Sequence, residues 1–354
     1  MRMSVVSRFA MNVTSGRVAR ARRLALAVPL AAVVAVGLSA CADPKHGSTA
    51  QPVPADTASA SASASSTATA SATPTATPTP TVLNGTAGNG LTISNGTRLV
   101  VMDGATVDFG TPVHDLAWSP DGKRAAFVDG SGNLVVAAPD GSGQVTVAKN
   151  PGGQTWSHPA WQVSVKDEHG YGHAYNRLFF TVEQSKVLRL MSVPATAADG
   201  TPEPLGLNKE SDDTVPDLPQ TGNLWPNSAA DGRRAVYANR NTGEVYVRDE
   251  YTRQTGIAFG KGSEPTVSPD GNEIVFVRSV DGHNHLFEQQ NFNEAPKDLT
   301  PGATTDYTEP AFSADGKTLA ARTEQGIVTL PANGSAAPTL VSGYTGLPAF
   351  RPAK

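Results

Sequence analysis

The stretch that most constrains this chain is AWSPDGKRAAF, Ala117 to Phe127, because weaker copies of it recur through the C-terminal three quarters of the sequence. Each copy has a short apolar segment, then Pro or Ala before Asp-Gly, then a segment that alternates apolar and polar residues. Asp-Gly accepts the positive φ of a tight turn at low steric cost, so each copy predicts a β-hairpin. The other copies are TVSPDGNEIVF from Thr266, AFSADGKTLAA from Ala311 and NSAADGRRAVY from Asn227.

The spacing of the copies is typical of β-propeller blades. Successive Asp-Gly turns are 110, 39 and 45 residues apart, and the first gap is long enough for two units and an insertion. A period of about 40–45 residues with strands in each unit indicates a propeller. A unit without Asp-Gly begins with SHPAW at Ser157, and a half-unit, Leu347 to Phe350, ends the chain. The sequence therefore predicts six inner strands.

Two sets of repeated residues have structural interpretations. Asp before Gly needs only local hydrogen bonds, so the repeated Asp residues are expected to be turn residues. Repeated aromatic residues on the inner strands are expected to pack between neighbouring blades. The turn residues are Asp121, Asp231, Asp270 and Asp315, and the aromatic residues are Trp118, Trp161, Phe312 and Phe350.

These units resemble the PD40 repeats of TolB-type six-bladed β-propellers, whose consensus is roughly E-P-x-W-S-P-D-G followed by I-A-F. The resemblance covers residues 90–354 and is strongest in the units that begin near Asp115, Glu264 and Glu309. It implies an all-β fold with six blades. No stretch of the sequence resembles the α/β domain of TolB itself, so the translocation role of TolB is not expected.

The two ends of the repeat region are expected to complete one blade together. Three short strands, Leu91–Ile93, Leu99–Met102 and Thr106–Phe109, precede the first full repeat without an inner strand. The C-terminal Pro348–Phe350 is an inner strand without followers. Pairing the two ends closes the ring and removes its open sheet edges.

The first 40 residues resemble a bacterial lipoprotein signal peptide. A basic segment ends at Arg22-Arg23, an apolar run extends from Leu24 to Leu38, and Leu38-Ser39-Ala40-Cys41 matches a lipobox. The resemblance implies that Cys41, the only Cys, becomes the lipidated first residue of the mature chain. An ordinary secretory signal with a bystander Cys is the alternative, and the arginine pair leaves Sec and twin-arginine export both open.

The segment after Cys41 is predicted to be a disordered tether. It is composed of Ala, Ser, Thr and Pro with almost no large apolar residue, so it cannot bury enough surface to offset its ordering entropy. The predicted organisation is a signal peptide at 1–40, the lipidated Cys and tether at 41–89, and the propeller at 90–354.

The charge of the mature chain argues against nucleic-acid binding. Residues 1–40 hold six Arg and no acid, so without them 22 Lys and Arg stand against 32 Asp and Glu, a net charge of −10. Binding to a phosphate backbone needs clustered Lys and Arg, and no such cluster occurs downstream.

Motifs for catalysis and metal binding are not found in the sequence. It contains neither Gly-x-Ser-x-Gly nor His-Glu-x-x-His, so no catalytic residue, metal or cofactor is predicted. Two His-containing stretches, 167–173 and 283–285, are expected to be solvated hairpins. An acidic, Pro-containing insertion, Ala198–Gly222, is expected to be either disordered or a contact surface.

A candidate binding site follows from aligning the repeats. One residue of each unit precedes the Pro position of the inner strand, and these residues should ring one mouth of the central channel. Three carboxylates, a His and a Trp there form a polar pocket for a partner or a cation. In the alternative interpretation, the acidic residue only hydrogen-bonds to the backbone of the next blade. The residues are Asp115, His158, Trp225, Glu264, Glu309 and Leu347.

The functional prediction is a non-enzymatic, lipid-anchored propeller on the extracytoplasmic face of the cell membrane. It resembles the TolB-like lipoproteins of actinobacteria and is expected to be a monomer that binds an envelope protein or a cell-wall ligand. Two alternatives remain open. One is an enzyme that acts on glycans with carboxylates at the channel mouth, and the other is a solute-binding sensor.

Overall fold

The computed structural model describes residues 82–207, 217–251 and 255–353. Its 24 strands form six four-stranded antiparallel sheets, the blades. Blade 1 is β4 (His114–Trp118), β5 (Ala125–Val128), β6 (Leu134–Ala137) and β7 (Val145–Ala148). Blade 2 is β8 (Thr155–Ser164), β9 (Tyr175–Gln184), β10 (Val187–Pro194) and β11 (Glu203–Pro204). Blade 3 is β12 (Asn223–Ser228), β13 (Arg234–Asn239), β14 (Glu244–Asp249) and β15 (Gly256–Lys261).

The remaining three blades include the one shared by the chain ends. Blade 4 is β16 (Ser263–Val267), β17 (Ile274–Val280), β18 (His283–Gln289) and β19 (Lys297–Asp298). Blade 5 is β20 (Thr308–Phe312), β21 (Thr318–Thr323), β22 (Gly326–Pro331) and β23 (Thr339–Ser342). Blade 6 is β24 (Leu347–Phe350), β1 (Leu91–Ser94), β2 (Leu99–Met102) and β3 (Ala105–Asp108).

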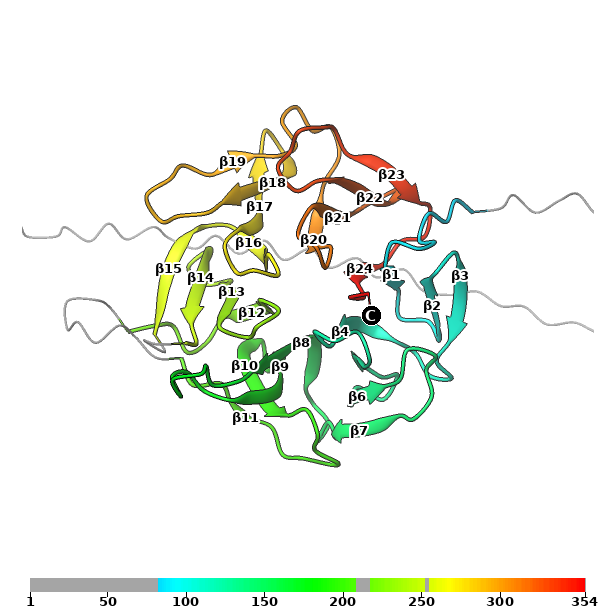
Figure 1. The fold of residues 1–354 in the computed structure, drawn as a ribbon, viewed down its shortest axis with the longest axis vertical. Helices are drawn as coiled ribbons and strands as arrows, with labels where there is room; N and C mark the ends of the chain where they lie inside the picture. The colour runs from blue at the N-terminus through cyan, green and yellow to red at the C-terminus, as the bar shows by residue number, and fades with distance from the viewer. Residues whose placement is uncertain (1–81, 208–216, 252–254, 354) are drawn as a thin grey trace, which may run out of the picture. The chain divides into compact units, whose positions relative to one another are not determined.

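The six blades close into a ring with the inner strands at its centre (Figure 1). Each inner strand contacts the inner strand of the next blade, and β24 contacts β4. The predicted all-β, six-bladed propeller is therefore confirmed. None of the residues described forms a helix long and apolar enough to cross a membrane.

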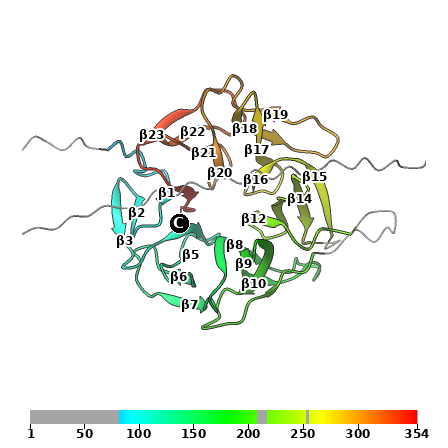
Figure 2. The same ribbon diagram turned by 180° about the vertical axis from the view of Figure 1, so that it is seen from behind.

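Blade 6 closes the ring as predicted. β24 pairs antiparallel with β1 from Leu91 opposite Phe350 to Ser94 opposite Leu347. Beyond β24, the Arg351 amide donates to the carbonyl of Gly90 at 2.8 Å, and its guanidinium Nε donates to the carbonyl of Gly122 in blade 1 at 2.8 Å. In Figures 1 and 2 the C-terminal end lies beside the inner strands.

Contacts with the propeller begin upstream of residue 90. Asn84 forms a β-bridge with Ser342 of β23, and the Gly85 amide donates to the Val341 carbonyl at 2.8 Å. Thr86 is fully buried, and its hydroxyl accepts the Gly104 amide between β2 and β3. Residues 84–86 thus connect the outer edge of blade 5 to blade 6. The predictions for residues 1–40, for Cys41 and for most of the tether lie outside the described residues.

The Asp-Gly turns have the local hydrogen bonds expected of them. In three turns the Asp carboxylate accepts a hydrogen bond from the hydroxyl of the Ser two residues earlier, at 2.6–2.7 Å, and one from the amide two residues later, at 3.1 Å. The Ser hydroxyl lowers the pKa of these carboxyls, which belong to Asp121, Asp270 and Asp315. Asp231 accepts only the Arg233 amide in this way, at 3.0 Å, because Ala229 replaces the Ser.

The repeated aromatic residues pack between blades, as predicted. The Trp118 indole donates to the hydroxyl of Thr92 in blade 6 at 3.0 Å, and the Trp161 indole donates to the carbonyl of Ala117 in blade 1 at 3.1 Å. Phe312 and Phe350 likewise pack within apolar clusters. Four of the six inner strands are therefore held by a packed aromatic side chain, and the two Trp residues add a hydrogen bond to the neighbouring blade.

Of the two interpretations of Ala198–Gly222, the disordered segment is wrong where the structure describes it, and the contact surface stays a prediction. Glu203–Pro204 forms β11, the fourth strand of blade 2. Leu205 and Leu218 are 4% and 6% exposed and pack in one cluster with Tyr237 of blade 3. Blade 2 needs an outer strand and an apolar cover, and the insertion supplies both. Residues 208–216 lie outside the described residues.

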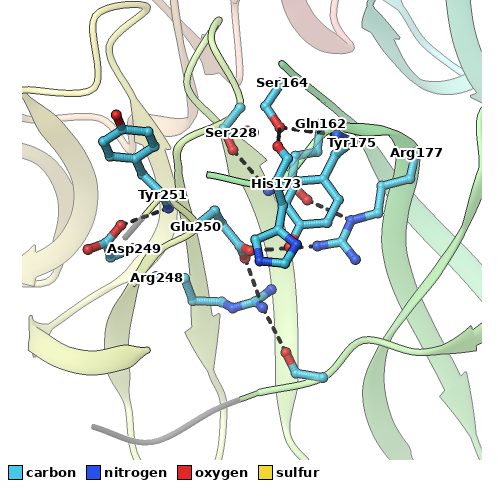
Figure 3. A network of polar contacts seen from close by, with 12 residues as sticks. Gln162, Ser164, His173, Tyr175, Arg177, Ser228, Arg248, Asp249, Glu250 and Tyr251 are labelled. Carbon is cyan, nitrogen blue, oxygen red and sulfur yellow. Dashed lines mark hydrogen bonds and ion pairs between the residues drawn. The ribbon is translucent and has the colours of Figure 1, made fainter. Parts of the chain in front are cut away.

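A buried ion network joins blades 2 and 3, where blade 2 has no Asp-Gly turn (Figure 3). The Glu250 side chain is 2% exposed, and its carboxylate lies 2.8 Å from Arg248 Nη2 and 3.7 Å from Arg177 Nη2. Arg177 Nε also donates to Gln162 Oε1 at 2.7 Å, and its guanidinium lies 4.1 Å from the centre of the Tyr175 ring. These contacts fix the long β8–β9 hairpin against the next blade.

Candidate functional site

One end of the central channel is built from a repeated irregularity of the backbone. In five of the six inner strands the register shifts by one residue at the same place, which makes a β-bulge. The first residue of each bulge has φ between 49° and 55°. Gly is the usual residue there, because a side chain in this region costs about 1–2 kcal/mol. The residues are Asp115, His158, Trp225, Glu264 and Glu309, five of those identified by repeat alignment.

The sixth inner strand is regular. Leu347 of β24 pairs with Ser94 without a register shift. All four residues of β24 pair one to one with β1, so this strand has no bulge. Blade 6 therefore contributes an apolar side chain to the ring where the other blades contribute polar or aromatic ones.

All six aligned residues line one cavity of about 270 Å³ that follows the inner strands. The bulge residues stand at the starts of these strands and form the polar end, which we call the channel mouth. Small and apolar residues line the cavity beyond it, including Ala117, Ala160, Ala311 and Ala349. The cavity thus combines an acidic mouth with an apolar interior.

A row of charged side chains crosses the channel mouth. His158 belongs to blade 2 and Glu309 to blade 5, which lie on opposite sides of the ring. Their Nε2 and Oε1 atoms are nevertheless only 3.5 Å apart. His158 Nδ1 lies 3.6 Å from Asp115 Oδ2, and Glu309 Oε2 lies 3.6 Å from Arg322 Nη1. Four side chains from blades 1, 2 and 5 are linked in this way.

Two of the carboxylates also hold the bulge of the following blade. Asp115 Oδ2 accepts the backbone amide of His158 at 3.0 Å, and Glu264 Oε2 accepts that of Glu309 at 2.6 Å. The backbone hydrogen bonds that the alternative interpretation expects are therefore present at Asp115 and Glu264. Glu309 differs, because its carboxylate is directed to His158 and Arg322.

The partly buried charges at the mouth shift one another's pKa values. Burial disfavours the His158 imidazolium, but attraction by Glu309, Asp115 and Glu264 outweighs it and raises the pKa of His158. Burial also raises the pKa of Glu264, and the charge of Glu309 adds to this. Burial opposes ionisation of Glu309 as well, yet attraction by His158 and Arg322 lowers its pKa. The pKa values of Glu264 and Glu309 are therefore shifted in opposite directions.

His158 is incompletely satisfied in this arrangement. Its Nε2 atom is buried and has no hydrogen-bond partner among the described residues, because the Glu309 oxygen at 3.5 Å is outside hydrogen-bonding geometry. The ring meets Trp225 edge-on, with ring centres 6.3 Å apart. A buried ring nitrogen without a partner is a costly feature, which singles out this position.

The other candidate residues lie apart from the mouth. Asp167 accepts the Tyr251 hydroxyl and the Tyr171 amide in the β8–β9 hairpin, and His285 Nδ1 is 2.8 Å from Asp298. Within the described ranges, no group of three or more His, Cys, Asp or Glu side chains is arranged to hold a metal ion. Sequence reasoning missed Arg322, which becomes visible only once β21 is placed in register beside Thr308 of β20.

Comparisons with known proteins agree with the fold and leave the activity open. No family model matches the chain. It is 26% identical over 216 residues to dipeptidyl-peptidase 5 of Porphyromonas endodontalis, a match that covers 56% of this chain and 28% of that protein. The chain therefore spans far less than two thirds of the curated relative that it matches.

Solved structures include two similar TolB proteins. TolB from Acinetobacter baumannii has a TM-score of 0.51 and 16% identity, over 74% of this chain and 66% of that chain. A putative TolB from Agrobacterium tumefaciens has a TM-score of 0.47 and 19% identity, over 72% of this chain and 89% of that chain. The likeness to the Acinetobacter protein shows a TolB-like six-bladed propeller fold.

Proposed function

We propose that this chain is a non-enzymatic binding scaffold of the cell envelope. In this proposal the lipidated Cys41 anchors it on the extracytoplasmic face of the membrane, and the channel mouth takes up an envelope protein or a cell-wall ligand. The lipobox and the Ala/Ser/Thr/Pro-rich segment support the location. The TolB-like fold supports a binding scaffold.

The observation that carries the proposal is the set of five bulged residues at the mouth. Backbone strain of this kind persists only where the surroundings impose it, and it clusters at functional sites. Backbone hydrogen bonds explain two of the carboxylates, Asp115 and Glu264. They do not explain why Glu309, His158 and Trp225 face one cavity in the same strained conformation.

Site-specific crosslinking in intact cells tests this proposal. A photoreactive benzophenone amino acid replaces Leu347 at the mouth or, as a control, the 39% exposed Leu340 on the outer strand of blade 5. We expect the Leu347 probe to capture a partner that the Leu340 probe does not, and Glu309→Gln to abolish the capture. Identical products from both positions would contradict binding at the mouth.

A second candidate function is general acid–base catalysis on a glycan. Burial raises the pKa of Glu264, while attraction by His158 and Arg322 lowers the pKa of Glu309. Two carboxyl groups with pKa values shifted apart in this way are typical of an acid–base pair. Its test is a screen of the purified protein on cell-wall and plant polysaccharides. Turnover that is lost in Glu264→Gln and Glu309→Gln, and kept when the exposed Glu324 is changed to Gln, would replace the scaffold function.

A further inference from the structure

We propose that the channel mouth binds an organic cation, an ammonium or guanidinium group on an aliphatic stem, as in a Lys or Arg side chain of a peptide. The inference rests on the proposed binding role of the mouth and adds the chemical class of the ligand. It follows from the charge balance, from the poor fit of His158 to its neighbours and from the shape of the cavity.

The charges at the mouth do not balance. Three carboxylates, from Asp115, Glu264 and Glu309, face two basic groups, His158 and Arg322. One negative charge remains even when His158 is protonated, and two remain when it is neutral. The Arg322 side chain is also 42% exposed, so solvent screens its contribution. A positive ligand therefore meets a net negative site in a partly enclosed space.

His158 fills the mouth with a poor geometry. Its two ring nitrogens stand 3.5 Å and 3.6 Å from the carboxylate oxygens of Glu309 and Asp115, too far for good hydrogen bonds. Charge-assisted N–H···O bonds prefer about 2.7–2.9 Å. An ammonium has three donors and a guanidinium five, so either can contact two carboxylates at normal distances where imidazole cannot. The 3.5 Å gap at His158 Nε2 leaves the facing Glu309 oxygen open to a closer donor.

The cavity accommodates the rest of a cationic side chain. Trp225 offers an indole ring at the mouth, and a cation beside an aromatic face gains further attraction. Beyond the mouth the lining is largely apolar and includes Ala117, Ala160 and Ala311. Lys and Arg carry aliphatic stems that pack on surfaces of this kind while the charged end stays with polar groups.

A matched pair of ligands tests the inference on the purified full chain. Nα-acetyl-arginine amide and Nα-acetyl-citrulline amide have nearly the same shape, but only the first is charged. In calorimetric titrations we expect the arginine amide to bind about tenfold more tightly or better. Glu309→Gln should remove most of this preference, whereas Glu324→Gln, a change of equal charge at an exposed turn, should leave it intact.

A second measurement avoids dependence on any variant. Binding of the arginine amide to the unmodified chain should weaken as NaCl is raised, while binding of the citrulline amide should not. Equal affinity for the two ligands, or arginine amide binding that does not depend on salt, would overturn the inference. So would binding of Ca²⁺ as tight as that of the arginine amide. These outcomes differ from failure of the proposed function, since crosslinking at Leu347 reports a partner whatever its charge.

Discussion

At the scale of single residues, the strained bulge positions connect sequence to function. Gly would be the most favourable residue at each of the five positions if backbone conformational energy alone mattered, since Gly adopts positive φ without a steric cost. The chain instead places carboxylates, an imidazole and an indole there. Stability is sacrificed at these positions to direct particular side chains into the mouth.

The strain itself can be measured at Glu264. Glu264→Gly and Glu264→Ala both remove the carboxylate, so the difference between them reports the cost of φ = 49° for a side chain. We expect the Gly variant to be more stable to chemical denaturation by about 1 kcal/mol. At Thr308, which is not among the positive-φ residues, the order should reverse by about 0.5–1 kcal/mol. The same order at both sites would contradict strain at the bulge.

The protonation of His158 gives a dependence on pH. Its pKa is raised above the ordinary value of 6.5, so its stabilising contribution is complete below that value and is lost as pH rises through the folded-state pKa. We therefore expect the free-energy difference between the unmodified chain and His158→Gln to be largest in acid and to shrink above about pH 6.5. Denaturation series at several pH values measure it, and a difference that grows with pH would contradict the assignment.

At the scale of strands and hairpins, the sequence predicts the features that recur in each repeat and misses the features that occur in one blade only. The Asp-Gly hairpins, the inner-strand aromatics and the ring of mouth residues follow from local turn chemistry and one period. β11, the burial of Leu205 and Leu218, and the contact of Arg322 with Glu309 depend on tertiary packing. No turn residue or periodic pattern predicts these features, because they form only when neighbouring blades are in place.

The buried network around Glu250 replaces a repeat turn and should be important for stability. Glu250→Ala leaves the Arg177 and Arg248 guanidinium groups without the carboxylate between them, and breaking a buried pair in this way costs about 3–5 kcal/mol. Lys149→Ala, at an exposed ion pair with Asp199, should have little effect. Denaturant midpoints compare the two variants. Equal midpoints would show that the network does not stabilise the junction of blades 2 and 3.

At the scale of the whole molecule, ring closure depends on a short C-terminal strand. Deleting Gly346–Lys354 removes β24, which pairs with β1 and contacts both β4 and β20. We expect the product to lose its cooperative thermal transition and to aggregate, because β1 becomes an open edge. A synthetic peptide of residues 346–354, added during refolding, should restore the transition by pairing with that edge. Unchanged melting of the deletion variant would contradict this closure.

The proposed anchor is testable on the whole chain in cells. Cys41→Ala removes the thiol that would accept the lipid, so we expect the protein to leave the membrane fraction or to remain unprocessed. Fractionation followed by mass measurement of the N-terminus distinguishes these states. A cleaved variant that still sediments with membranes would contradict lipid anchoring through this residue.

The bridge at Asn84–Ser342 determines where a mechanical load would enter the fold. Any force that pulls on the chain upstream of residue 82 reaches the blades through this short bridge, including the 2.8 Å bond from Gly85 to Val341 and the 2.9 Å bond from Gly343 to Leu83. Such a pull strains this weak attachment before it strains β1 and its register with β24. We therefore expect the Asn84–Ser342 bridge to open under tension before the closed ring is disturbed.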